Sequence, residues 1–218
     1  MKFLGEPRSG SFAGQTSSRN RFGQYVRSRA TPVNPNSTFQ SAVRARLSLN
    51  AAAWRALTDV QRAGWTSLGL QMVRTDSLGQ TYNLTGFAAY CSVNNNNLAA
   101  GNAVVSAAPT FQTPTAVTSV TWTLTSAASS VAFTPTPLGA GQRLFAYASP
   151  QRAAGRNFEA DYRLIAVGGA ATASPLVIFT PYQSRLGTPV TGNRIFLSVT
   201  VYSAGFESPP FLVSQIVA

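Results

Sequence analysis

The stretch that decides the fold is IFLSVTVYS, residues 195–203, in which apolar and polar side chains alternate. Alternation with a period of two places successive side chains on opposite faces of a β-strand. The stretch therefore predicts a strand, and it is the longest of several similar runs in the second half of the chain.

Six further runs of this kind follow residue 118, separated by turns rich in Gly, Pro, Ala and Ser. They are SVTWTLTS (119–126), VAFTPT (131–136), LFAYAS (144–149), YRLIAV (162–167), LVIFTP (176–181) and FLVSQIVA (211–218). Seven short strands at roughly even spacing are typical of an immunoglobulin-like or fibronectin-type β-sandwich. We therefore predict an Ig-like β-sandwich over residues 101–218, without the Cys–Trp–Cys pattern of antibody domains.

Residues 36–100 have helical periodicity instead. Ser37 or Thr38 can cap a first helix. The apolar residues of that helix recur at spacings of three and four, and they are Phe39, Val43, Leu47 and Ala51 or Trp54. Thr58 and Gln61 have the spacing of a capping box, in which each side chain bonds the other residue's backbone N–H. Two helices joined there predict a small helical hairpin closed by Trp54 and Trp65.

A turn or short hairpin is expected over residues 75–86, and a third short helix is expected after Thr85. Cys91 would lie on the apolar side of that helix as a small core residue. The helix ends in four consecutive asparagines, residues 94–97. Asparagine is a poor residue for a helix interior, so this end is expected to fray.

The first 35 residues are rich in Gly, Ser, Arg and Gln, and neither helical nor strand periodicity lasts more than a few positions. We predict an extended basic arm with one short strand at residues 25–29, kept extended afterwards by Pro32 and Pro35. The candidate partner-binding residues of this arm are Arg19, Arg21, Phe22, Tyr25, Arg27 and Arg29. The complete prediction is an α+β, mainly β chain with an arm (1–35), a helical hairpin region (36–100) and a β-sandwich (101–218).

The chain has a net charge of +11, and its basic residues are 16 arginines and a single lysine. Arginine offers a planar fork that pairs with carboxylate or phosphate and stacks on aromatic rings. Only 11% of the residues are charged, well below the average of about 25% for a soluble domain. A surface so poor in charge is typical of a subunit that is covered by neighbours in an assembly.

The composition argues against catalysis. The 218 residues include no histidine, one cysteine and six acidic residues, so no disulfide, metal centre or cofactor is expected. Glu159 and Asp161 could share a strand face as an acid/base pair, but Arg156 and Arg163 flank them and predict a ladder of salt bridges. No apolar run is long enough to span a membrane, and the N-terminus does not have the pattern of a signal peptide, so synthesis in the cytoplasm is expected.

The block from residue 15 to about residue 90 resembles a set of uncharacterised proteins encoded by tailed phages, prophages and some bacteria. These proteins share an NPxT-like turn, then Gln and Arg on a helix, then W-x-x-LT-x-x-QR-x-x-W. The matching residues here are Asn34, Pro35, Thr38, Gln40, Arg44, Trp54, Leu57, Thr58, Gln61, Arg62 and Trp65, followed loosely by residues 84–86. The resemblance implies a virion context rather than a known activity. Trp54, Thr58, Gln61 and Trp65 have structural readings as well, because a cap and two core tryptophans need no ligand.

From the residues and this resemblance we expect a non-enzymatic virion structural protein, made in the host cytoplasm. It would be a capsid decoration subunit or a head–tail or tail component, in a homo-oligomer or symmetric assembly. Its arm would lie across acidic surfaces of other virion subunits, with strand addition and arginine–carboxylate pairs.

Three alternatives stay open. The arm could bind single-stranded nucleic acid through arginine and aromatic side chains, or it could be a solvated tail. The β-sandwich could instead bind host-surface carbohydrate, which would require exposed aromatic rings among Tyr147, Tyr162, Tyr182 and Tyr202.

Overall fold

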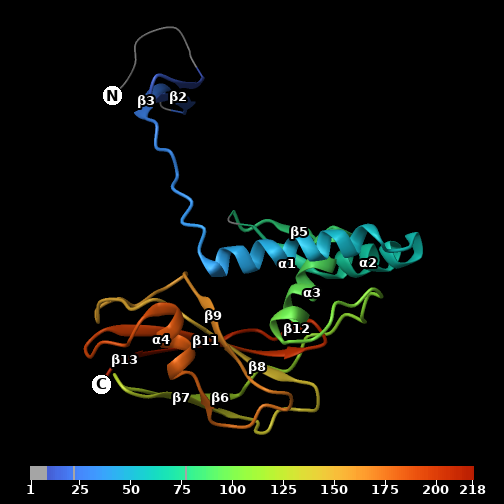
Figure 1. Cartoon of the computed structure of the whole chain (residues 1–218), viewed down its shortest axis with the longest axis vertical. Helices are drawn as coiled ribbons and strands as arrows, with labels where there is room; N and C mark the ends of the chain where they lie inside the picture. Colours follow the sequence, from blue (N-terminus) through green and yellow to red (C-terminus); the bar gives the residue numbers. More distant parts are fainter. Residues whose placement is uncertain (1–8, 22, 77) are drawn as a thin grey trace. The chain divides into compact units, whose positions relative to one another are not determined.

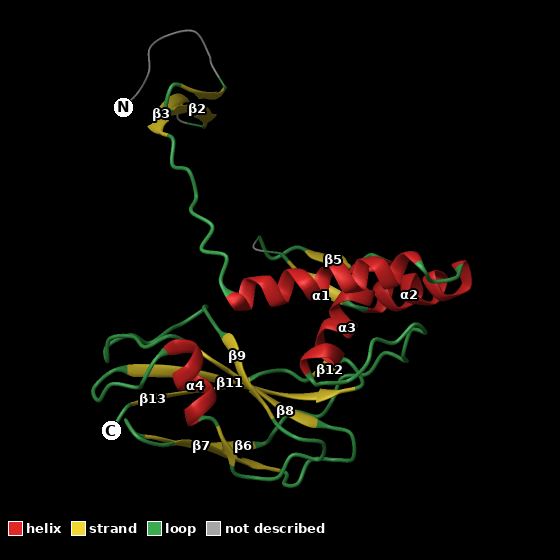
Figure 2. Cartoon of the chain, viewed as in Figure 1, coloured by secondary structure: helices red, strands yellow, loops and turns green. Residues whose placement is uncertain are grey.

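The computed structural model describes residues 9–21, 23–76 and 78–218, which form a mixed α+β protein (Figure 1, Figure 2). The chain divides into two compact units, Met1–Ala42 and Val43–Ala218, and the boundary falls within the first helix.

The first unit contains a small antiparallel sheet in the order β1-β2-β3. Its strands are β1 (Gly10–Phe12), β2 (Gln15–Asn20) and β3 (Gly23–Ser28). The sequence predicted an extended arm with one strand, whereas the structure has three strands. The turn between β1 and β2 explains the difference, because Ala13 and Gly14 both have positive φ, at 45° and 78°. A two-residue turn of this hand matches the twist of the paired strands.

Residues 29–37 are neither helix nor strand, and α1 (Thr38–Arg55) follows them. Ser37 and Gln40 start the helix with reciprocal bonds, since each side chain accepts from the other residue's backbone N–H at 3.3 Å. The predicted apolar face of this helix is not buried: Val43 is 63% exposed and Leu47 is 51% exposed.

The second unit continues with two more helices and a hairpin. These elements are α2 (Asp59–Gln71), β4 (Val73–Thr75), β5 (Thr81–Asn83) and α3 (Gly86–Ala99). The predicted capping box of α2 is present: Thr58 Oγ1 accepts from the Gln61 backbone N–H at 3.3 Å, and Gln61 Oε1 accepts from the Thr58 backbone N–H at 3.0 Å. Thr85 caps α3 as predicted, since its hydroxyl accepts from the Ala88 backbone N–H.

Trp54 and Trp65 both pack against α3, where each contacts the ring of Tyr90. Trp65 is fully buried, its ring meets Tyr90 edge to face at 5.0 Å, and its indole N–H donates to the Ser106 carbonyl at 2.8 Å. Trp54 is half-buried and contacts Tyr90 and Phe87. The prediction that Trp54 and Trp65 close a core between two helices is therefore wrong. Both tryptophans contact aromatic rings of the third helix instead.

Helix α2 approaches the start of α3 closely because it has a glycine at the contact. A Cβ at Gly69 would collide with the Leu84 backbone carbonyl. The buried cluster beside this contact includes Leu68, Met72 and Cys91, and it extends to Phe206 in the β region. Cys91 is thus a core residue, as predicted.

The remaining elements form two antiparallel sheets and one helix. They are β6 (Ser119–Leu124), β7 (Ser129–Thr134), β8 (Arg143–Ala148), β9 (Arg163–Val167), β10 (Leu176–Val177), α4 (Phe179–Leu186), β11 (Arg194–Ser203), β12 (Phe206–Glu207) and β13 (Phe211–Ile216). One sheet has the order β10-β7-β6. The other has the order β12-β11-β8-β9, with β13 also paired to β11. Figure 1 shows the two sheets as separate layers.

The largest hydrophobic cluster receives alternate side chains from both sheets. Trp122 of β6 and Val131 of β7 meet Leu144 of β8 and Leu197 and Val199 of β11 in this core. The opening stretch 195–203 thus forms most of the longest strand, and eight of its nine residues are buried.

Each of the seven predicted runs contains a strand, but the run at 176–181 differs in extent. Its strand ends at Val177, and α4 begins at Phe179. Pro181 lies in the first turn of α4, where its missing N–H costs no helical hydrogen bond. Tyr182 anchors the helix, because it is buried and its hydroxyl donates to the Ser149 carbonyl at 3.1 Å.

The four asparagines at 94–97 do not fray; they join α3 to the β region. Asn94 is fully buried and bonds both polar groups of the Val105 backbone, accepting from its N–H at 2.8 Å and donating to its carbonyl at 3.2 Å. Asn97 accepts a hydrogen bond of 2.7 Å from the Tyr202 hydroxyl of β11.

The other two asparagines extend the same network. Asn96 donates to the Gly205 carbonyl at 3.0 Å, and Asn95 accepts from the buried Asn50 of α1 at 2.9 Å. The prediction of a frayed end was wrong because helix propensity describes a side chain in water. Here Asn94 and Asn97 are buried, and the four amides bond groups of other segments.

We expect Asn94→Ala to lower the free energy of unfolding by about 2–4 kcal/mol, because it removes two hydrogen bonds to the Val105 backbone and empties a fully buried position. Urea unfolding followed by circular dichroism measures this loss. The control is Asn83→Ala, which removes the same group from an exposed strand and should change stability by less than about 0.5 kcal/mol. Equal effects of the two substitutions would contradict this role of Asn94.

Candidate functional site

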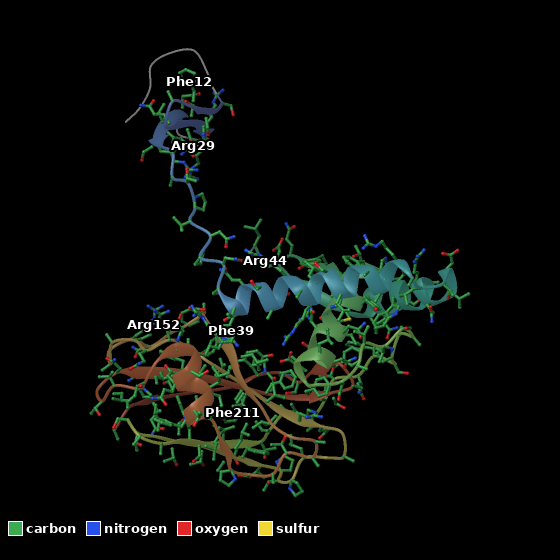
Figure 3. All side chains as sticks on the ribbon, viewed as in Figure 1. Phe12, Arg29, Phe39, Arg44, Arg152 and Phe211 are labelled. Carbon is green, nitrogen blue, oxygen red and sulfur yellow. The ribbon has the colours of Figure 1, made fainter. Side chains whose placement is uncertain are left out.

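The predicted partner-binding arginines lie on the N-terminal sheet. Arg19 is in β2, Tyr25 and Arg27 are in β3, Arg21 is in the turn after β2 and Arg29 follows β3. Phe22 lies outside the described residues. Figure 3 labels Arg29 on this part of the chain.

The strand register divides these side chains between two faces. Tyr25 is opposite Ser18 and Arg27 is opposite Thr16, whereas Arg19 is opposite Gln24. Since successive residues point to opposite faces, Tyr25 and Arg27 share one face and Arg19 lies on the other. The sequence predicted a strand only at residues 25–29, so it did not predict this division, which depends on the pairing of β2 with β3.

The N-terminal sheet has no core. None of its described residues is buried, and Phe12, the large apolar side chain of β1, is 86% exposed (Figure 3). Small sheets need a hydrophobic face packed against something to be stable in water. The sheet therefore has two faces and two outer strands, β1 and β3, that are suited to contact with another molecule.

The charge of this region has one sign. Residues 9–58 contain seven arginines and no acidic residue. Arg19, Arg27 and Arg29 make no ion pair with any residue that the structure describes. Their complement is therefore expected on a separate anionic group, either carboxylate or phosphate.

The acidic pair of the β region is a salt-bridge cluster. Glu159, which is 5% exposed, is paired with Arg152 and with Arg156, the second at 3.5 Å. Asp161 pairs with Arg163 at 3.1 Å. Figure 3 labels Arg152, which sequence reasoning missed because it precedes the run that contains the acids.

This cluster is unsuited to general acid catalysis. The hydrogen bond from Arg152, followed by those from the backbone N–H groups of Asp161 and Ala160, lowers the pKa of Glu159 to about 2. A carboxylate held by two arginines stays ionised at neutral pH and offers no proton. The cluster instead fixes the loop that precedes β9 to the sheet.

The tyrosines named for carbohydrate binding are covered to different extents. Tyr182 and Tyr202 are 2% and 1% exposed, so their rings are not available for stacking. Tyr147 and Tyr162 are half-buried. The exposed aromatic surface that a sugar would need is therefore not supplied by this set.

Within residues 9–21, 23–76 and 78–218, no three His, Cys, Asp or Glu side chains come together as metal ligands. Among the same residues, no helix has the length and apolar character needed to cross a membrane. Comparison of the sequence with known protein families and with curated proteins finds no match in either.

We expect the Glu159 cluster to make stability depend on pH in the acid range. Because the folded-state pKa is lowered from 4.5 to about 2, the stabilisation is present above about pH 4.5 and is lost as the pH falls toward 2. Melting temperatures of the wild-type protein and Glu159→Gln should therefore converge across this interval.

The control for this comparison is Asp59→Asn, since the side chain of Asp59 is 98% exposed in its pair with Arg62. Its melting curve should keep a nearly constant offset from wild type over the same range. A constant offset for Glu159→Gln as well would rule out the ion-pair cluster as the source of the acid sensitivity.

Proposed function

We propose that this chain is a non-enzymatic structural protein of a tailed-phage virion, a capsid decoration subunit or a head–tail or tail component. The observation that carries the proposal is the N-terminal sheet, which is basic, has no buried residue and is followed by an irregular segment. In this proposal the sheet and its arginines anchor the chain on acidic surfaces of neighbouring subunits.

The energetics of the N-terminal sheet favour an anchor. Ordering the backbone costs about 1–2 kcal/mol per residue, and this sheet offsets little of that cost by burial. The outer strands β1 and β3 each pair only with β2 among the described residues. An added strand from a neighbour would bond their free backbone groups, and carboxylates would pair with Arg19, Arg27 and Arg29.

We also infer that the two sheets of the second unit form an Ig-like β-sandwich of the fibronectin type. The strand orders support this inference, because the three-stranded sheet β10-β7-β6 shares one core with the strands β9-β8-β11-β13 of the five-stranded sheet, whose fifth strand is the two-residue β12. Such a module would face outward from the particle or contact symmetry mates. The resemblance of residues 15–90 to phage and prophage proteins supports the virion context.

Nucleic-acid binding is the second candidate, and one observation favours it. Tyr25 and Arg27 lie on the same face of β3, which would allow a base to stack beside an arginine bound to phosphate. Affinity for a single-stranded oligonucleotide would then fall with salt, with a slope of about 0.7 per neutralised phosphate. Binding to acidic protein surfaces would instead require no nucleic acid and would survive nuclease treatment.

The direct test is mass spectrometry of purified virions, with negative-stain imaging, to count copies of this chain per particle. Hundreds of copies would support a decoration role, and a dozen or fewer would support a neck or tail role. Absence of the chain from particles would overturn the virion proposal.

We expect Arg27→Glu to reduce the number of copies per particle severalfold, because it reverses a charge at the proposed anchor. The matched control is Arg55→Glu, an equal charge change at an exposed position near the end of α1. Quantitative mass spectrometry of particles grown with each variant gives the comparison. Equal incorporation of both variants would show that the N-terminal sheet is not the anchor.

A further inference from the structure

A pocket of about 360 Å³ lies within the second unit, between the helical region and β12. Its lining comes from the end of α2, β4, α3, the segment before β6, and β11 with β12. The volume is in the range of small ligand sites. Two charged residues line it, Glu207 of β12 and Arg74 of β4.

Glu207 is a half-buried carboxylate that has no cationic partner among the described residues. Its Oε2 atom accepts hydrogen bonds from the Tyr147 hydroxyl at 2.9 Å and from the Thr200 hydroxyl at 2.8 Å. Its Oε1 atom makes no hydrogen bond with a described residue. By contrast, Glu159 and Asp161 are held by arginines, as described above.

The Tyr147 hydroxyl donates a hydrogen bond to Glu207 and stays protonated while it does so. Burial, together with the nearby charge of Glu207 and the hydrogen bond to it, raises the pKa of the Tyr147 hydroxyl well above its ordinary value. The hydroxyl therefore stays protonated at physiological pH. The carboxylate is oriented by two neutral donors on one oxygen, and the other oxygen is available to a ligand.

Two amide oxygens add to the acceptors of this pocket. The Asn96 amide nitrogen donates to the Gly205 carbonyl at 3.0 Å, and the Gln112 amide nitrogen donates to Ser203 at 3.4–3.5 Å. With the nitrogens engaged, both side-chain oxygens can accept from a ligand. The lining is therefore rich in acceptors, and a ligand with several donors would satisfy it.

An aromatic ring completes the lining. Phe111 is 40% exposed and rests edge to face on the buried Phe206, with ring centroids 5.6 Å apart. An aromatic ring that is held by a neighbouring ring and remains partly exposed can attract a flat cation.

We propose that this pocket binds the guanidinium group of an arginine side chain. Guanidinium is planar and carries five N–H donors, so one N–H can bond the open Oε1 atom of Glu207 while others reach further acceptors of the lining. It would pair with Glu207, donate to Asn96 or Gln112 and stack on Phe111. A lysine ammonium would supply the charge but neither the widely spaced donors nor the flat face.

Arg74 provides an internal test of the sign of the ligand's charge. It is exposed and lines the same pocket, so its charge opposes a cation and attracts an anion. For a guanidinium ligand, loss of Glu207 weakens binding and loss of Arg74 strengthens it. For an anionic ligand both effects have the opposite sign.

The arginine comes from a second copy of this chain, and this step rests on the proposed anchoring role of the N-terminal segment. Residues 19–29 supply four arginines and no acidic residue to such a contact. Glu207 is a carboxylate that lacks an ion pair with a described residue, so the charges of two copies are complementary. The neighbour that the arginines contact would then include another copy of the same protein.

The test uses the full chain and a synthetic peptide of residues 15–31, titrated by isothermal calorimetry. We expect the peptide to bind wild-type protein, to bind Glu207→Gln about tenfold more weakly and to bind Arg74→Gln more tightly. A peptide with lysine at all four arginine positions should also bind more weakly than the native peptide. Glu207→Gln keeps an oxygen that accepts from Tyr147 and Thr200, and its melting temperature shows that the fold is intact.

Sedimentation velocity supplies the second readout. Self-association of the full chain that increases with concentration and is reduced in Glu207→Gln and in Arg27→Glu supports the second copy as the source. No peptide binding, equal binding of the lysine peptide, or the reversed signs at Glu207 and Arg74 would overturn the proposal. If the peptide fails to bind and virions nevertheless contain the chain, the pocket proposal falls and the virion proposal stands.

Discussion

The hydrogen bonds of the asparagines in α3 are the interaction on which the second unit depends. The segments around Val105 and Gly205 are outside helices and strands, and asparagine side chains supply partners for their backbone groups. An amide carries both a donor and an acceptor, and Asn94 uses both on one residue of the neighbouring loop. The position of α3 over β11 and β12 follows from these bonds. That position in turn brings Phe206 into the helical core and creates the pocket beside Glu207.

The two units of the chain differ in how much apolar surface they bury. The second unit buries alternate side chains of two sheets in one core and closes the helical region with Trp65 and Tyr90. The N-terminal sheet satisfies its inner backbone groups by strand pairing but buries no side chain. The hydrophobic burial is thus concentrated in the second unit, and in the proposed anchoring role the N-terminal sheet would gain its stabilisation from contacts with partners. The arginines of that sheet would then favour anionic partners.

Local signals in the sequence predicted much of the fold. The alternating runs, the capping residues Thr58 and Thr85 and the core role of Trp65 depend on neighbours within a few positions. Strands β1 and β2 were missed because QTSSRN has no apolar alternation and the turn at Ala13 lacks the usual Asn-Gly pair. The exposed face of α1, the bonding of the asparagines and the orientation of Glu207 depend on contacts between distant segments. Periodicity cannot report such contacts. The arginines of the candidate site were predicted, whereas their faces required the strand register.

The burial of Cys91 has a practical consequence for experiments on this protein. The chain contains one cysteine, which is 9% exposed, and burial raises the pKa of its thiol. A thiol reagent reacts with the thiolate, so modification requires α3 to open first. The labelling rate under native conditions therefore measures how often α3 separates from the cluster that contains Cys91 and Phe206. Comparison of this rate with the rate of global unfolding distinguishes local opening of α3 from unfolding of the whole unit, and the native cysteine is the only probe required.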